Sequence, residues 1–157
     1  MNTISRDDLL YLAGLIDGDG SLIAQIVRRG DYRFQFQIRL TLQITQRKKR
    51  KHFLQEVQQI IGAGTIRDRG HISDYVLTEA RLVYSFLKQL SPFLRMKQKQ
   101  ANLIIRIIEQ LPSSKKSALV FVELCRISDQ VAELNDSKGR TITADVVETY
   151  LKELKII

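Results

Sequence analysis

A long run of alternating side chains, residues 32–45, most constrains how this chain can fold. From residue 34 to residue 44 every even-numbered position is apolar, and from 33 to 45 every odd-numbered position is polar. Successive side chains of a β-strand point to opposite faces, so a period of two predicts one strand with a core face and a solvent face. The chain must therefore cover one side of a sheet and leave the other side exposed.

The rest of the chain supplies partners for this strand. Apolar residues at helical spacing predict a first helix over residues 7–17, with acidic residues in its first turn, where the helix dipole favours them. Residues 21–29 predict a strand, joined to the alternating run by a turn at Gly30 and Asp31. Similar patterns predict a helix over 47–61, a hairpin over 65–78, and helices over about 79–90, 95–111 (before Pro112), 117–134 and 143–155.

This order of elements predicts an α+β fold in which helices cover one face of an antiparallel sheet. At 157 residues the chain can bury enough surface to fold as one domain without disulfides. Its single cysteine, Cys125, lies in an apolar-periodic segment and is expected to be a buried thiol. The longest apolar runs are too short to span a bilayer.

The charge of the chain favours a polyanionic partner. Lys and Arg number 25 against 17 Asp and Glu, a net charge of +8. Membrane surfaces and acidic proteins could also bind a chain of this charge. The exposed face of the alternating strand, however, carries Gln, Arg and Thr and no acid, and Arg and Gln can read guanine and adenine edges from a two-stranded ribbon. The simpler alternative is that this sheet face only contacts solvent. Arg67 and Arg69 on the second hairpin add positive charge and favour nucleic acid as the partner.

Two carboxylates, Asp17 and Asp19, end the first helix among glycines. An EF-hand is excluded because its sixth and twelfth positions would be Leu22 and Arg28. They could be turn residues between helix and strand. They could also serve phosphodiester cleavage, which needs hard divalent cations held by carboxylate oxygens.

A metal-dependent site would need more than one such carboxylate, and the chain holds a single copy of this segment. The second must then come from another chain. Ala13, Gly14 and Gly18 are small residues of the kind that lets two helices approach closely.

Residues 12–20, LAGLIDGDG, match with one substitution the motif that names the LAGLIDADG homing endonucleases. The similarity continues in AQI (24–26), TQ (45–46), IRDRG with SDY (66–75), KQKQAN (97–102), IIEQLPS (107–113) and LNDSK (134–138). Over nearly its whole length the sequence resembles the single-motif, homodimeric subgroup encoded in organellar ribosomal-RNA introns.

The resemblance implies the αββαββα fold with added C-terminal helices, its antiparallel sheet forming a DNA-binding saddle. It implies one domain over residues 1–157 that dimerises through the helix at about 7–18. The implied function is site-specific, divalent-metal-dependent hydrolysis of both strands of a long pseudo-palindromic DNA site, promoting intron homing. The implied metal is Mg²⁺, with Mn²⁺ as an alternative, and the implied compartment is an organelle, the chloroplast before the mitochondrion. An intron-encoded RNA maturase, which binds RNA without cleaving DNA, is the alternative function.

The resemblance also implies roles for matching positions. Asp19, with the Gly18 carbonyl, would bind metal, and Gln46 would position water. Arg50 and Lys97 would lie near the scissile phosphates. Both lie among other cations, so the sequence without the resemblance would predict only a general phosphate contact for each. The implied DNA contacts are Ile23, Gln25, Val27, Arg29, Tyr32, Gln37, Arg39, Gln43, Arg67, Arg69, Asp74 and Val76, with Ser137 and Lys138 on the DNA backbone. The expected dimer contacts are Leu12, Ala13, Gly14, Ile16 and Asp17, of which Asp17 is expected to be a structural cap rather than a ligand.

Overall fold

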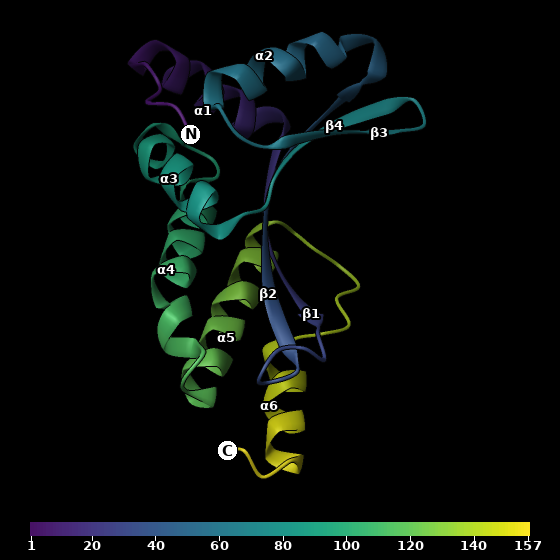
Figure 1. The fold of residues 1–157 in the computed structure, drawn as a ribbon, viewed down its shortest axis with the longest axis vertical. Coiled ribbons are helices and arrows are strands. Elements are labelled where there is room, and N and C mark those ends of the chain that lie inside the picture. Colours follow the sequence, from purple (N-terminus) through teal and green to yellow (C-terminus); the bar gives the residue numbers. More distant parts are fainter. The chain divides into compact units, whose positions relative to one another are not determined.

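The computed structural model describes all 157 residues (Figure 1). The elements are α1 (Arg6–Asp19), β1 (Gly20–Arg28), β2 (Phe36–Arg47), η1 (Lys48–Arg50), α2 (Lys51–Ile61), β3 (Thr65–Arg69), β4 (Ile72–Leu77), α3 (Ala80–Leu90), η2 (Ser91–Phe93), α4 (Gln98–Ser114), α5 (Ala118–Leu134) and α6 (Ala144–Glu153). The predicted order of helix, hairpin, helix, hairpin and further helices is confirmed. None of the helices has the length and apolar character needed to cross a membrane.

Polar side chains define where three of the helices begin. Ser5 precedes α1 and accepts a hydrogen bond from the backbone N–H of Asp8 at 3.1 Å. Ser117 and Thr143 do the same for α5 and α6. Each of these side chains satisfies one of the N–H groups that a helix start leaves unpaired.

The four strands form one sheet in the order β1-β2-β4-β3. Strand β4 runs antiparallel to both β2 and β3, with Gln43 opposite Val76 and Arg67 opposite Asp74. This confirms the predicted antiparallel sheet and the α+β class.

The chain contacts divide into two compact units. The first comprises Met1–Leu22 and Leu40–Asn102, and the second comprises Ile23–Arg39 and Leu103–Ile157. Strands β1 and β2 therefore contribute residues to both units. That residues 1–157 act as one domain stays a prediction.

The first unit has a core built by α1, α2 and α3 with the strands. Helix α1 contacts α3, and α2 contacts both β3 and β4. Leu12 and Ile16 of α1, Ile44 of β2 and Tyr75 of β4 are completely buried. Burial of such large side chains is the main favourable contribution to folding here.

The second unit has its own core on the apolar face of its strand segments. Phe34 contacts Phe121 of α5 with ring centroids 5.8 Å apart, and Phe36 meets Tyr150 of α6 edge-on at 5.4 Å. Helices α5 and α6 pack against each other (Figure 1). Cys125 of α5 is buried as expected, and burial raises the pKa of its thiol to about 12.

The alternating run corresponds to a shorter strand than predicted. Strand β2 begins at Phe36, not at residue 32, although its burial alternates as expected. Residues 30–35 form a turn closed by hydrogen bonds from the backbone N–H of Arg29 to the Gln35 carbonyl and from that of Gln35 to the Tyr32 carbonyl. Gln35 has a left-handed φ of 66°. The turn residues happen to alternate in polarity, so the pattern could not show where the strand starts. The prediction of a turn limited to Gly30 and Asp31 was wrong.

The helix predicted before Pro112 also has different bounds. Helix α4 spans Gln98–Ser114 and holds Pro112 within its last turn. Proline lacks an N–H, so the carbonyl of Ile108, four residues earlier, loses its helical partner. The Leu111 carbonyl, just before the proline, is satisfied by the Ser114 hydroxyl at 2.7 Å and by the Lys115 N–H at 3.3 Å. The helix therefore continues past the proline by about half a turn.

Gly64→Ala should test how tightly Tyr75 packs on the backbone. Gly64 has a φ of +95°, and a Cβ added there would lie 2.6 Å from the Tyr75 ring and hydroxyl. Tyr75 is fully buried and donates its hydroxyl to the Ala63 carbonyl at 3.0 Å, so it cannot retreat. Backbone strain of about 1–2 kcal/mol and overpacking of about 1–3 kcal/mol should together lower the free energy of unfolding in urea.

Gly70→Ala is the matched control. Its φ is +57°, but nothing lies within 4 Å of an added Cβ, so only the strain of about 1–2 kcal/mol applies. Equal losses of stability in the two variants would contradict the close contact at Tyr75.

Candidate active site and nucleic-acid interface

The carboxylate of Asp17 holds the segment that precedes α4. It accepts the backbone N–H of Arg95 at 2.8 Å and that of Lys97 at 3.0 Å. Desolvation raises the pKa of Asp17, but the hydrogen bonds from the backbone of Arg95, Lys97 and Met96 outweigh it and bring the pKa below its ordinary value. Both oxygens of Asp17 are thus engaged with protein donors and serve to fasten residues 95–97 to the end of α1.

Lys97 completes this attachment from the other side. Its ammonium donates a hydrogen bond to the backbone carbonyl of Asp17 at 2.7 Å. The last carbonyls of a helix have no partner within the helix, and a lysine there is favoured by the helix dipole. Lys97 therefore caps α1 in this structure.

Asp19 is the last residue of α1, where the sequence predicted a position just past the helix. Its side chain is exposed and accepts a hydrogen bond from the Gln46 amide at 3.3 Å. The Gln46 amide oxygen in turn accepts from Nε of Arg50 at 3.0 Å. A helix end, a strand and a 3₁₀ turn thus bring three of the predicted catalytic residues into one hydrogen-bonded row.

These three side chains line an open pocket of about 330 Å³. Its other lining residues are Thr45, Arg47 and Ile72. Lys97, predicted to act with them, does not line this pocket. Thr45 and Arg47 were not predicted as site residues. Each carried a signal in the sequence, Thr45 in the matched segment TQ (45–46) and Arg47 as the first residue of the cationic run RKKRK.

The donor set of this pocket suits a hard divalent cation. It offers the carboxylate of Asp19 and amide and hydroxyl oxygens, without thiolate or imidazole. Mg²⁺ commonly binds one or two carboxylates and completes its shell with water and phosphate oxygens. No group of three or more His, Cys, Asp or Glu side chains occurs in the chain, so one copy supplies a single carboxylate here.

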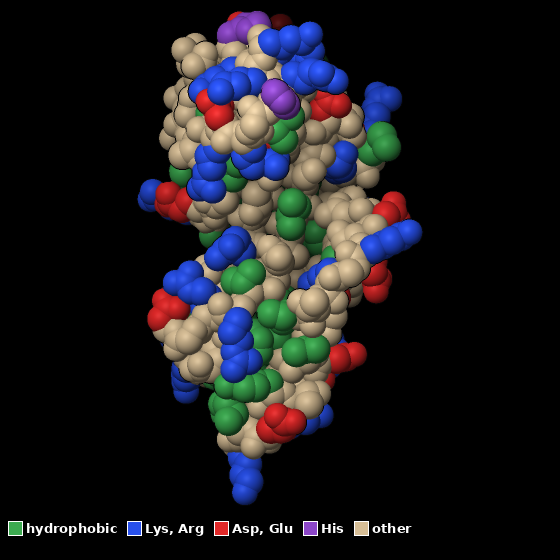
Figure 2. Space-filling model, turned by 90° about the vertical axis from the view of Figure 1, so that its right-hand side faces the viewer, with side chains coloured by type: hydrophobic (Ala, Val, Ile, Leu, Met, Phe, Trp, Pro, Cys, Tyr) green, Lys and Arg blue, Asp and Glu red, His purple; other side chains and the backbone are tan.

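The predicted DNA-contacting residues lie on the polar face of the strands, in the turn between β1 and β2, and in the segment after α5. In the first unit they are Gln43, Arg67, Arg69, Asp74 and Val76, and in the second unit Ile23, Gln25, Val27, Arg29, Tyr32, Gln37, Arg39, Ser137 and Lys138. All except Asp74 have exposed or half-exposed side chains. Figure 2 shows Lys and Arg side chains gathered around the histidines on one face of the first unit.

Asp74 is a correction to the predicted contacts. The residue is only 3% exposed. Its carboxylate accepts hydrogen bonds from the Gln43 amide at 2.9 Å, from the Thr45 hydroxyl and from Nε of Arg69. The hydrogen bond from Arg69 is the largest of the effects that hold the pKa of Asp74 below its usual value. Asp74 therefore positions Gln43 and Arg69, and its own carboxylate is buried beneath the polar face.

The expected dimer contacts on α1 are also corrected in part. Leu12, Ala13 and Ile16 are buried in the core of their own chain, at 0–2% exposure. The outward face of α1 instead carries Leu10 and Tyr11, together with Gly14 and Gly18, where an added Cβ would meet nothing within 4 Å. Because α1 is apolar on both faces, its pattern could not show which face is buried within the chain.

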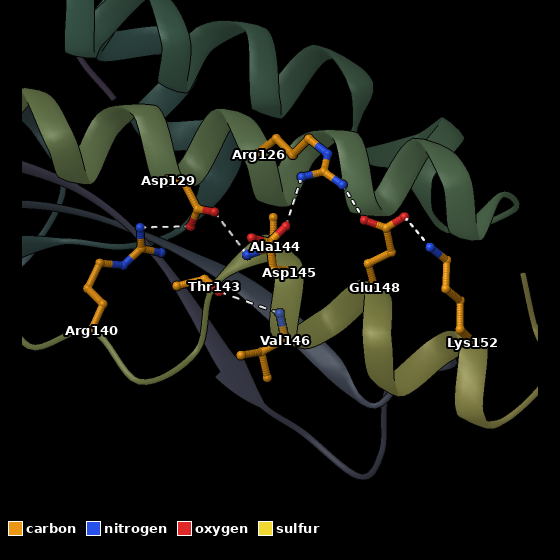
Figure 3. A network of polar contacts seen from close by, with 9 residues as sticks. All are labelled: Arg126, Asp129, Arg140, Thr143, Ala144, Asp145, Val146, Glu148 and Lys152. Atoms are coloured by element: carbon orange, nitrogen blue, oxygen red, sulfur yellow. Dashed lines mark hydrogen bonds and ion pairs between the residues drawn. The ribbon is translucent and has the colours of Figure 1, made fainter.

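Asp129 of α5 binds the segment that carries Ser137 and Lys138 at two points, Arg140 and the start of α6 (Figure 3). One carboxylate oxygen forms an ion pair with Arg140 at 2.8 Å, and the other accepts the first backbone N–H of α6, from Ala144, at 2.9 Å. Ser137, Lys138 and Arg140 line a pocket of about 390 Å³ with Ile23 and Gln25. The sequence contained no signal for the roles of Asp129 and Arg140, because these two residues are brought together only by the turn between α5 and α6.

Comparison with known proteins places these features in one family. Residues 12–94 match the sequence profile of the LAGLIDADG endonucleases. The chain is 52% identical over 155 residues to DNA endonuclease I-CreI of Chlamydomonas reinhardtii, covering 98% of this chain and 95% of that protein. It is 38% identical over 145 residues to DNA endonuclease I-CvuI of Chlorella vulgaris, covering 92% and 89%. A crystal structure of I-CvuI with the I-CreI target, in the presence of magnesium and with the DNA not cleaved, has a TM-score of 0.92 to this chain at 35% identity and 97% coverage of both.

Asp74→Asn should make stability depend less on pH. The folded-state pKa of Asp74 lies below the ordinary 3.8, so its contribution to stability is present above that value and is lost as the pH falls through the folded pKa. The variant should lose about 1–3 kcal/mol of unfolding free energy at neutral pH, because three donors lose a buried, charged acceptor. In urea titrations at decreasing pH, the difference from the parent should shrink as the pH falls below 3.8.

Asp145→Asn makes the same charge change at a side chain that is 86% exposed and should leave stability nearly unchanged at every pH. A stability difference between Asp74→Asn and the parent that stays constant down to low pH would contradict the lowered pKa.

Proposed function

Because the chain belongs to the LAGLIDADG endonuclease family, we propose that it is a site-specific homing endonuclease that hydrolyses both strands of a long pseudo-palindromic DNA site. The observation that carries this function is the row of Asp19, Gln46 and Arg50 in an open, cation-lined pocket. Such a pocket admits a phosphodiester backbone and offers it both a metal ligand and positive charge. An RNA maturase that cleaves no DNA has no use for this row, and the two relatives described above are both named DNA endonucleases.

Each residue of the row has a distinct part in the proposed reaction. Asp19, with the Gly18 carbonyl, would hold Mg²⁺, which supplies a polarised phosphate and an activated water. The Gln46 amide, bonded to both Asp19 and Arg50, is oriented to position water beside the phosphate. The guanidiniums of Arg50 and Arg47 offset charge that develops on the phosphate oxygens. Lys97 contributes by fixing the carbonyl end of α1, from which Asp19 projects.

We propose that two copies are needed to cut two strands. One copy supplies a single metal-binding carboxylate, and a symmetric pair brings two of them together. The outward face of α1 is suited to this pairing, since Leu10 and Tyr11 are 47% and 55% exposed and Gly14 and Gly18 allow close approach. Met96, 76% exposed, lies in the adjoining segment that Asp17 holds.

The polar face of the strands would read each half-site. Arg and Gln side chains there can make bidentate contacts with base edges, while Ser137 and Lys138 would contact the phosphate backbone. Intron homing in an organelle, the chloroplast before the mitochondrion, is the biological role that we propose, in keeping with relatives from the algae Chlamydomonas and Chlorella.

Asp19→Asn should abolish cleavage and keep DNA binding. The amide is nearly the same size as the carboxylate but is a poor ligand for Mg²⁺. Cleavage of DNA spanning the intron insertion site should fall by at least about a thousandfold, while the dissociation constant in gel shifts changes by less than about threefold. Glu56→Gln, an equivalent change at an exposed position of α2, should cleave like the parent.

Two results would count against this role. Loss of DNA binding in Asp19→Asn would make the residue structural. Parent protein that leaves this DNA intact with Mg²⁺, yet binds the intron RNA tightly, would identify a maturase instead.

Gly14→Leu should separate folding from association. An added side chain at Gly14 meets nothing in its own chain, and replacing a helical glycine should raise the free energy of unfolding of the monomer by about 0.5–1 kcal/mol. The same side chain would hold two α1 helices apart, so sedimentation should show a shift from dimer to monomer. Gln55→Leu, at an exposed position of α2, is the control for surface leucines. A Gly14→Leu protein that stays dimeric would exclude this face as the interface.

A further inference from the structure

Arg29, directly after β1, is held by a residue that the sequence suggested only as part of a turn. Its Nε donates to Oδ1 of Asp31 at 2.9 Å, and its Nη2 donates to Oδ2 at 2.8 Å. This is a bidentate pair that occupies one whole edge of the guanidinium. The hydrogen bond from Arg29 is the largest of the effects that lower the pKa of Asp31, so the pair stays ionised at neutral pH.

Two further contacts restrict the guanidinium. Nη1 donates to the Gln37 side-chain oxygen at 3.4 Å, and the group lies 5.4 Å from the centroid of the Tyr32 ring. The backbone of the same turn is closed by the N–H of Arg29 on the Gln35 carbonyl at 2.9 Å. All of these partners belong to the second unit, and Gln37 projects from the polar face of β2. Arg29 is therefore placed on that face before any ligand arrives, which reduces the rotamer entropy lost on binding.

The hydrogen bonds already made decide what Arg29 can still donate. A guanidinium has five N–H groups in a fixed plane. Asp31 takes two and Gln37 takes one, which leaves one N–H on Nη1 and one on Nη2. The pair is open to solvent, since the side chains of Arg29 and Asp31 are 41% and 63% exposed. Donors on the two Nη atoms of one guanidinium are the groups that pair with the O6 and N7 acceptors of guanine in the major groove.

The charge of the pair favours base reading over phosphate binding. A free arginine on a DNA-facing surface is attracted to any phosphate, whereas one paired with a carboxylate has little net charge. An unpaired aspartate in the same place would be repelled by DNA. Arg29 and Asp31 together therefore add to discrimination between bases rather than to affinity for DNA in general.

We propose that Asp31 is a specificity-determining positioning residue that fixes Arg29 to read one guanine in each half-site. The proposal rests on the proposed function, in which this face meets DNA. Asp31 acts through Arg29 and itself contacts no base.

Selection from a randomised double-stranded DNA library tests the proposal. Every full-length protein would carry Asp19→Asn, so that bound DNA stays intact. The parent should select guanine at one symmetric pair of positions. Adding Asp31→Ala should reduce that preference by about tenfold or more at these positions alone, the discrimination expected of a bidentate arginine–guanine contact. Arg29→Ala should affect the same positions, and the double variant should show no further loss.

The controls distinguish failure of this proposal from failure of the proposed endonuclease function. Asp145→Asn removes the same charge from α6, which packs on the apolar face of β2 through Tyr150, and should leave every selected position unchanged. Thermal melting of each variant would confirm that it is folded. A position that responds to Asp31→Ala but not to Arg29→Ala, or no response at any position, would overturn the proposal while leaving the endonuclease function intact. Failure of the parent to select any DNA would overturn both.

Discussion

The attachment of the end of α1 to the segment before α4 is the interaction on which the site depends. Asp17 accepts two backbone N–H groups from that segment, and Lys97 returns a hydrogen bond to the Asp17 carbonyl. This reciprocal pair satisfies polar groups that a helix end would otherwise leave unpaired. With the helix end held, Asp19 projects two residues later toward Gln46 and Arg50. One aspartate of the motif thus holds the helix end in place, while the other remains exposed.

Carboxylates elsewhere in this basic chain also serve to orient other groups. Asp74 gathers Gln43, Thr45 and Arg69, and Asp129 holds Arg140 together with the start of α6. Asp31 holds Arg29 in the same way. A surface that binds a polyanion can tolerate acids when each is engaged by a cation or an amide donor. Such pairs reduce the conformational freedom of arginines that would otherwise bind phosphates without discrimination.

The sequence predicted correctly those features that follow from a local period or from a matched motif. The alternation of residues 34–44 predicted the two faces of β2, and the family resemblance singled out Asp19, Gln46 and Arg50, which the structure joins by hydrogen bonds. The predictions were wrong where one sequence pattern is compatible with two different structures. Helix α1 is apolar all round, so Leu12 and Ile16 were assigned outward, and the alternating turn residues made β2 seem to start at residue 32.

The sequence by itself determined the order of elements, the buried face of the long strand and the family, because these follow from local periodicity and from matched motifs. Only the tertiary structure decided what each polar side chain bonds to. Asp74 and Asp31 have the same chemistry and neither has a local pattern, yet one is buried beneath Arg69 and the other is exposed beside Arg29. Hydrogen-bond partners depend on distances between side chains in three dimensions, and in this chain those distances are set by the turn after β1 and the pairing of β4 with its neighbours.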